Sequence, residues 1–412
     1  MKFEAPRGTQ DVLPAQQPLW EKVTRTAEEV CAAYGYDRIT TPVFEDTELF
    51  ARTSGEGSDV VQKEMYTFTD RGDRSLTLRP EATASVARAY VQHGLHREPQ
   101  PVKTFFIGSI YRYAAPQRGK LREFWQLNVE AMGSDDPAVD AEIVQLYSEL
   151  LRRLGIEGWW LELNSIGDRN CRPAYIERLE SWLDEHEEDL DEDTRAKRKT
   201  SPLRVFDNLP QKPEPVQRAL ESAPKIGESL CDECQAHFDA VRRYLDAYGV
   251  EYRLTPTLVR GLDYYTRTTF EFMAGALGAS LSLAGGGRYD YLIEEIGGPA
   301  TPAVGIASGL ERLVLTLIEQ GVEAPGREVD VFFAVEDDGA REDVLAALAE
   351  LRRDGRAADT DYAGRSLKGQ LTQAGRVGAK ATVIARADGA TVRRAGKQDE
   401  EFGSLAEAVK SL

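Results

Sequence analysis

The sequence contains little cysteine and histidine, with only four residues of each among 412. So few cysteines do not provide a disulfide framework. No run of about 18 apolar residues is present, so we expect no transmembrane helix. The first eleven residues lack the apolar segment of a signal peptide. Together these absences predict a soluble, cytoplasmic protein with no membrane partner.

An excess of positive charge is also missing, because 51 lysines and arginines face 69 acidic residues for a formal net charge of −18. Proteins that coat nucleic acids are usually basic, so the charge argues against that class. Local basic patches that bind one RNA remain compatible with this negative net charge. The 42% apolar and 29% charged residues are typical of a globular protein, and the length predicts two or three domains.

Several common catalytic signatures are absent as well. The sequence has no G-x-x-x-x-G-K-[ST] loop and no G-x-G-x-x-G after a first strand. It also has no H-E-x-x-H and no G-x-S-x-G. If the protein uses ATP, we therefore expect side chains on an antiparallel sheet to hold the phosphates.

Hydrophobic periodicity predicts the elements of the first part of the chain. Residues 19–34 and 140–154 have the spacing of helices, and Gly35 is a plausible helix end. The expected strands are 38–44, with Pro42 favouring an edge position, and 76–78, 103–113 and 124–132, the last two as an antiparallel pair.

The segment from about 168 to 251 is acidic and helical in pattern, which predicts an insertion within a larger domain. Strand patterns resume at 268–272 and 279–284, and 303–317 reads as a strand that continues into a helix. Residues 322–328 read as a linker. Beyond them, alternating elements are expected at 329–335, 340–354, 356–362, 366–376, 381–385 and 405–412. The prediction is an α+β fold with a small C-terminal α/β domain.

Five blocks of sequence carry a resemblance to a known family. Three blocks match the loose class II synthetase signatures, namely 35–45, 106–126 and 303–312. Two blocks are more specific, namely 258–266 and 284–290. On these blocks the chain resembles the histidine–tRNA ligases over essentially its whole length. The resemblance implies a class II catalytic domain at 1–322, with its antiparallel sheet and the helical insertion, and an anticodon-binding α/β domain at 329–412.

The family's reaction has two steps, which the resemblance implies for this chain. The carboxylate of L-histidine attacks the α-phosphate of ATP, which enters with Mg²⁺, to give histidyl-adenylate and pyrophosphate. The terminal adenosine of tRNA(His) then attacks the adenylate. Because the substrate supplies the nucleophile, catalysis rests on positioning and on cations near the phosphates. The first class II block further implies a homodimer.

Three arginines are the candidate catalytic residues. Arginine is always charged and binds phosphate through two parallel hydrogen bonds. The resemblance places Arg112 at the α-phosphate and Arg312 at the γ-phosphate and adenine. Arg260 would bridge the histidine carboxylate and the α-phosphate. Alone, each of these arginines is more readily explained as a surface ion pair.

The candidate histidine pocket combines acidic and neutral polar side chains. By resemblance the ammonium group contacts Glu81, Thr83 and Gln126, the imidazole N–H donates to Glu130, and the other nitrogen faces Tyr264, with Tyr265 lining the pocket. Gln126 and Glu130 are four apart on an expected strand and so share one face. The glycines at 285–287, 305 and 309 would allow a ligand or another backbone close approach.

Two basic segments are candidate tRNA contacts. The loop at 116–122 would grip the acceptor end through Gln117, Arg118 and Lys120, although Ala114 and Ala115 depart from the family pattern there. The C-terminal domain contains seven more cations that would contact anticodon phosphates, namely Lys368, Arg376, Lys380, Arg386, Arg393, Arg394 and Lys397. A solvated charged surface is the alternative for both.

No metal centre is assigned from the sequence. Cys231 and Cys234 form a single C-x-x-C, which is weak evidence for zinc without a second pair. Asp168 and Cys171 lie upstream at the same spacing, so an altered four-ligand site is conceivable. The four histidines show no metal-binding pattern.

Two alternative functions are open at this stage. A non-catalytic regulatory subunit of histidine biosynthesis shares the catalytic fold but typically lacks the C-terminal domain and the active-site arginines. Another class II synthetase would have a different substrate-specific block at 258–266. The presence of all three arginines and of residues 329–412 favours the histidine–tRNA ligase.

Overall fold

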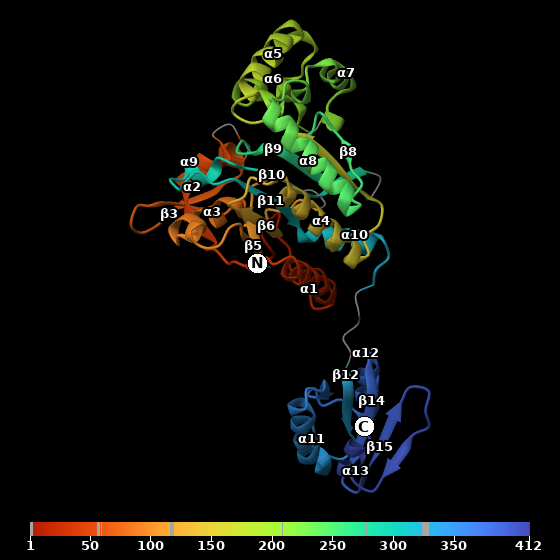
Figure 1. Cartoon of the computed structure of the whole chain (residues 1–412). Coiled ribbons are helices and arrows are strands. Elements are labelled where there is room, and N and C mark those ends of the chain that lie inside the picture. Colours follow the sequence, from red (N-terminus) through yellow and green to blue (C-terminus); the bar gives the residue numbers. More distant parts are fainter. Residues whose placement is uncertain are drawn as a thin grey trace. The chain divides into compact units, whose positions relative to one another are not determined.

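The computed structural model describes residues 3–55, 58, 60–115, 119–207, 209–276, 279–323 and 329–412. The chain divides into two compact units, residues 1–12 with 19–323 and residues 13–18 with 324–412. Figure 1 colours the larger unit from red to cyan and the smaller unit in blue. Within the described ranges, no helix combines the length and apolar character needed to cross a lipid bilayer.

An eight-stranded sheet with the order β1-β5-β6-β11-β10-β9-β7-β8 is the scaffold of the larger unit. Pairing is antiparallel from β5 through β7 and parallel at both edges. The strands are β1 Asp37–Arg38, β5 Val102–Tyr111, β6 Glu123–Met132, β7 Trp159–Ser165, β8 Arg253–Leu254, β9 Thr266–Ala276, β10 Ala279–Arg288 and β11 Ala303–Gly309. A second, antiparallel sheet contains β2 Phe44–Asp46, β4 Ser75–Leu78 and β3 Tyr66–Thr69.

Helices flank these two sheets. They are α1 Gln17–Ala33, α2 Thr47–Ser54, α3 Thr83–Gln92, α4 Pro137–Leu154, α9 Leu292–Glu295 and α10 Leu310–Glu319, with the shorter η1 Val60–Glu64 and η2 Leu95–Arg97. The boundaries of α4 follow from its sequence, because Asp136 accepts a hydrogen bond from the Ala138 N–H and Gly155 adopts a φ of 77° after the last turn.

The insertion lies between β7 and β8 and is helical, as expected. It consists of α5 Arg172–Glu185, η3 Glu187–Asp189, α6 Glu192–Thr200, η4 Pro202–Phe206, η5 Leu209–Gln211, α7 Glu214–Ser222, η6 Ile226–Glu228 and α8 Asp232–Tyr248. It has its own apolar core, which includes Leu179, Leu183, Val205 and Leu220. Figure 1 shows these helices above the eight-stranded sheet, with α8 running back down to it.

The smaller unit is an α/β domain built on a five-stranded sheet of order β13-β12-β14-β15-β16. Its elements are β12 Val329–Val335, η7 Asp338–Ala340, α11 Arg341–Arg353, β13 Ala358–Thr360, α12 Leu367–Arg376, β14 Ala379–Arg386, β15 Gly389–Arg394, β16 Glu400–Phe402 and α13 Leu405–Lys410. Val331, Phe333, Leu348 and Val383 belong to its buried core.

The expected α+β class with a flanked antiparallel sheet is confirmed. The single strand predicted at 38–44 was wrong, because the segment contributes β1 to the large sheet and only its end to β2 in the small one. Pro42 lies between them and has no N–H to donate to a ladder. The linker predicted at 322–328 falls largely outside the described residues.

Candidate active site

Glu130 is the centre of a cluster of buried polar side chains on the large sheet. It lies on β6 with 1% of its surface exposed. Its Oε1 accepts hydrogen bonds from Thr83 Oγ1 at 2.7 Å and Asn128 Nδ2 at 3.3 Å, and its Oε2 accepts one from the Tyr289 hydroxyl at 2.6 Å. Burial raises the pKa of Glu130 to about 8. These donors position the carboxyl, but because they are neutral they cannot form an ion pair with it.

Glu81 borders the same cluster and lies two residues before the start of helix α3. Its two oxygens accept hydrogen bonds from the backbone N–H groups of Thr83 at 2.6 Å and Ala84 at 2.7 Å. Burial raises the pKa of Glu81, and these N–H groups and the charge of Arg112 oppose that rise. The carboxylate thereby fixes Thr83, whose hydroxyl faces Glu130.

Three tyrosines pack beside this cluster. The rings of Tyr264 and Tyr265 lie 4.6 Å apart, and those of Tyr264 and Tyr289 lie 5.7 Å apart edge to face. All three are at least nine-tenths buried. Burial raises the pKa of each phenol, so these hydroxyls remain protonated and act as neutral donors.

Glycines open the space that the charged side chains occupy. A Cβ on Gly305 would overlap Glu130 Oε2, and Gly305 is the register partner of Glu130 across β11 and β6. A Cβ on Gly285 would overlap the Arg260 guanidinium. The glycine-rich stretch of β10 and β11 is therefore required by close approach of side chains to the sheet.

The charges of Arg112 and Arg260 both act on Arg312. Burial lowers the pKa of Arg312, and the positive charges of Arg112 and Arg260 lower it further, against the opposing charge of Glu271. Arg312 Nε donates to the Gly119 carbonyl at 3.4 Å, and Arg312 also contacts the Ser282 carbonyl. Arg112 Nε donates to the Pro80 carbonyl at 2.7 Å. Such clustered cations suit a polyanionic ligand.

Arg260 is positioned by a carboxylate and an aromatic ring. Its Nη1 lies 3.1 Å from Glu271 Oε1 on β9, and its guanidinium carbon lies 6.0 Å from the Tyr265 ring centre. Glu271 also accepts a hydrogen bond from Ser282 Oγ. Arg260 Nε is buried without a hydrogen-bond partner among the described residues. That unpaired donor is available to a ligand.

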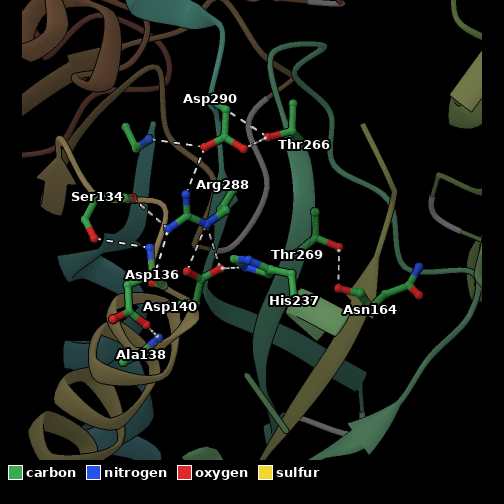
Figure 2. A network of polar contacts seen from close by, with 11 residues as sticks. Ser134, Asp136, Ala138, Asp140, Asn164, His237, Thr266, Thr269, Arg288 and Asp290 are labelled. Atoms are coloured by element: carbon green, nitrogen blue, oxygen red, sulfur yellow. Dashed lines mark hydrogen bonds and ion pairs between the residues drawn. The ribbon is translucent and has the colours of Figure 1, made fainter. Parts of the chain in front are cut away.

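A second buried network holds the end of β10, next to Tyr289. Arg288 on β10 is fully buried and donates to both oxygens of Asp140 on α4, at 3.1 and 2.9 Å, and to Asp290 at 2.9 Å. His237 of α8 lies 3.2 Å from Asp140. Figure 2 shows Arg288 at the centre, facing Asp140 and Asp290. The network connects α8, the last helix of the insertion, to the end of β10.

Of the residues predicted to bind histidine, the structure brings Glu81, Thr83, Glu130, Tyr264 and Tyr265 together. Gln126 is buried on β6, and its Oε1 has no hydrogen-bond partner among the described residues. Lys120 follows Gly119, whose carbonyl contacts Arg312, and its ammonium group lies 3.8 Å from Glu64. Gln117 and Arg118 lie outside the described residues. In the smaller unit, Lys380, Arg386, Arg393 and Arg394 each pair with a neighbouring carboxylate.

Comparison with known proteins identifies the family. The family model described as histidyl-tRNA synthetase matches residues 8–313, which include every pocket residue above. The chain belongs to the histidyl-tRNA synthetase family.

Relatives of the synthetase family match almost the whole chain. The histidine–tRNA ligase of Desulforamulus reducens is 48% identical over 380 residues, covering 92% of this chain and 90% of that one. That of Halothermothrix orenii is 46% identical over 385 residues, covering 93% and 91%. The apo crystal structure of the Staphylococcus aureus histidyl-tRNA synthetase has 36% identity and a TM-score of 0.83, covering 100% and 99%.

These comparisons confirm the expected enzyme class, an ATP-dependent aminoacyl-tRNA ligase of class II architecture. They favour the histidine–tRNA ligase over the regulatory subunit, because several such ligases match more than nine-tenths of the chain.

Sequence reasoning missed several residues of this synthetase site. Tyr289 and Glu271, which hold Glu130 and Arg260, were not singled out, although Tyr289 lies two residues after the triple glycine. Glu311, beside Arg312, was also missed. Its Oε1 accepts the Trp125 N–H at 2.8 Å, and burial raises its pKa to about 7. An acidic residue on a glycine-lined strand pair is the signal that would have suggested Glu271.

Proposed function

We propose that this histidine–tRNA ligase binds L-histidine in the pocket of Glu130 and binds the triphosphate of ATP beside Arg112, Arg260 and Arg312. The observation that carries the assignment is the position of Arg260 between the tyrosines and Arg312. Arg260 lies over Tyr265 of the pocket and within reach of the charge of Arg312. A carboxylate bound between Arg260 and the tyrosines would meet the α-phosphate there.

The chemistry assigned to the arginines is charge stabilisation. The histidine carboxylate attacks the α-phosphorus, the bond to the bridging oxygen breaks, and pyrophosphate leaves with the electron pair. Negative charge spreads over the phosphate oxygens in the transition state, and preorganised guanidinium groups stabilise it most when water is excluded. Mg²⁺ enters with ATP as part of the nucleotide substrate.

Selection of histidine is assigned to Glu130 and the tyrosines. A neutral imidazole offers one donor and one acceptor. Glu130 accepts the ring N–H, and the Tyr264 hydroxyl donates to the other nitrogen. An amino acid without these two atoms would leave buried polar groups unpaired, which selects against it by roughly 10⁴-fold or more. Thr83, Gln126 and Glu81 are assigned to the ammonium group, with the Gln126 Oε1 as its free acceptor.

Pyrophosphate–ATP exchange with each of the twenty amino acids tests the substrate. Exchange with histidine alone is expected without tRNA. Exchange supported by another amino acid would mean that Glu130 and Tyr264 face a different ligand.

We further propose that the enzyme is a cytoplasmic homodimer that receives the tRNA(His) anticodon on the smaller unit and its acceptor end beside Lys120, Gln117 and Arg118. The small sheet supports the dimer, because Val43, Phe44 and Phe68 are 41 to 48% exposed on or beside its edge strands. Exposed apolar clusters of this kind mark protein interfaces. Sedimentation should give a dimer at micromolar concentration for the wild type and a monomer for Phe44→Arg. A monomeric wild type would contradict the proposal.

A further inference from the structure

Four potential metal ligands meet at the base of the insertion. Asp168 follows β7, Cys171 precedes α5, and Cys231 and Cys234 lie at the start of α8. The carboxylate and sulfur atoms of these residues all lie within 4.8 Å of one another. Two segments some sixty residues apart in sequence are thus joined at one point, and the core of the insertion lies between them.

Two separations between ligand atoms match those on a single tetrahedral ion. Cys171 Sγ lies 3.9 Å from Cys234 Sγ and 3.7 Å from Asp168 Oδ1. Zinc bonds of about 2.3 Å to sulfur and about 2.0 to 2.2 Å to oxygen place two sulfurs about 3.8 Å apart, and a sulfur and an oxygen about 3.5 to 3.7 Å apart. A disulfide would need its sulfurs at about 2.05 Å. The sulfurs therefore have the separation of two ligands on one ion.

The burial of this cluster favours a bound cation. Cys234 is fully buried, and Asp168 and Cys171 are 1% and 6% exposed. As metal ligands, the thiolates and the carboxylate carry negative charge, which is costly to bury unless a cation is bound to it. Positive groups around the cluster offset the remaining charge, since Arg267 Nη2 lies 3.5 Å from Asp168 Oδ2 and the N-termini of two helices converge there.

We propose that Asp168, Cys171, Cys231 and Cys234 bind one structural zinc ion. Thiolates favour zinc over magnesium or calcium, and four protein ligands fill a tetrahedral shell without leaving a position for substrate. Cys31, the remaining cysteine, lies on α1 and is not part of the cluster. The assignment of this ion does not depend on any role proposed above for the active site.

The ion would also stabilise the wall of the histidine pocket. Arg172, next to Cys171, donates from Nη2 to the carbonyl of Tyr265 at 2.7 Å and to that of Gly167 at 3.2 Å. Arg267, which faces Asp168, lies two residues after Tyr265 in β9. Loss of zinc should therefore loosen the Tyr265 segment and raise the KM for histidine. This consequence rests on the proposed role of Tyr265, whereas the metal content does not.

Elemental analysis of the full-length protein tests the proposal. The protein is produced in zinc-supplemented medium, freed of any histidine tag and dialysed. About one zinc per chain is expected. Cys234→Ala and Cys231→Ala should lose the metal, Asp168→Cys should retain it as a four-cysteine site, and the control Cys31→Ala should retain it. Stoichiometric iron, or zinc that is unchanged in Cys234→Ala, would overturn the assignment.

A measurement on the wild type avoids dependence on how well the variants fold. Titration with Co²⁺ after removal of bound metal should give the thiolate-to-cobalt absorption and the visible bands of a tetrahedral site, saturating at one equivalent and displaced by Zn²⁺. Thiol titration of the denatured protein should find four free cysteines. No tetrahedral cobalt spectrum and no bound zinc, or only two free thiols, would refute the proposal.

Discussion

The Tyr289 hydroxyl donates a 2.6 Å hydrogen bond to Glu130 across a strand that lies between them. Tyr289 follows β10 and Glu130 lies on β6, while β11 separates the two strands. The contact exists because β11 carries Gly305 at this position, where any Cβ would overlap Glu130. The pocket is therefore specified by β6, β10 and β11 together, and substitutions on individual strands test it.

Replacing Glu130 should change how stability depends on pH. The carboxyl has an ordinary pKa of 4.5 and a folded pKa of about 8, because of burial. Between these values the folded state holds a proton that the unfolded state has lost, so this group's contribution to stability falls as pH rises. Glu130→Gln removes that loss. The unfolding free energy of the variant relative to wild type should rise by up to a few kcal/mol between about pH 5 and pH 8.

Urea denaturation across this pH range measures the effect. Glu149→Gln is the matched control, because hydrogen bonds from Arg152 lower the pKa of Glu149 to about 2 and both states are ionised throughout. Its difference from wild type should stay flat. A flat difference for Glu130→Gln as well would contradict the raised pKa.

Gly305→Ala should weaken histidine binding. The added Cβ overlaps Glu130 Oε2 and lies 3.0 Å from the Val129 carbonyl, so the carboxyl must move. We expect the KM for histidine in the exchange reaction to rise by about tenfold or more, equivalent to about 1.4 kcal/mol. Gly227→Ala is the control, since nothing lies within 4 Å of its Cβ position. Equal KM values for both variants would argue against the proposed pocket.

Asp140→Asn should destabilise the larger unit strongly. Asp140 and Arg288 are both fully buried and joined at 2.9 Å, with His237 on the same carboxylate. Removing one partner of a buried ion pair typically costs about 3 to 5 kcal/mol. An exposed pair such as Arg52 with Glu48 contributes less than about 1 kcal/mol, so Arg52→Gln serves as the comparison. Similar unfolding free energies for the two variants would show that the buried network is not stabilising the fold.

Lys368→Glu should impair the use of tRNA and leave amino-acid activation unchanged. Lys368 is exposed on α12 of the smaller unit. If Lys368 contacts a phosphate, the KM for tRNA should be higher in the variant. The slope of the logarithm of the tRNA binding constant against the logarithm of the salt concentration should fall in magnitude by about one. Lys410→Glu on α13 provides a control of equal charge change. The assignment fails if both variants bind tRNA as the wild type does.

Local patterns allowed much of the fold to be predicted from the sequence. Strand period and β-branched residues gave β5 and β6 as an antiparallel pair, and helix period gave α1 and α4. The error at 38–44 arose because Pro42 interrupts a run that otherwise has strand composition. Strands β15 and β16 were missed because both segments are short and rich in charge.

The candidate site was only partly accessible to sequence reasoning. Gln126 and Glu130 were placed on one face from the two-residue period alone. The partners Tyr289 and Glu271 depend on which strands are neighbours and in what register, and periodicity does not contain that information. The cysteine cluster was weak evidence in sequence for the same reason, since its two halves meet only when α5 and α8 start side by side.

The most direct test of the central claim is the single-turnover rate of histidyl-adenylate formation in Arg260→Ala. We expect a fall of about 10² to 10³-fold, because a preorganised cation is lost at the reacting phosphate. The control Arg243→Ala, on the exposed side of α8, should keep the wild-type rate. A wild-type rate in folded Arg260→Ala would contradict the placement of the reacting groups between Arg260 and the Glu130 pocket.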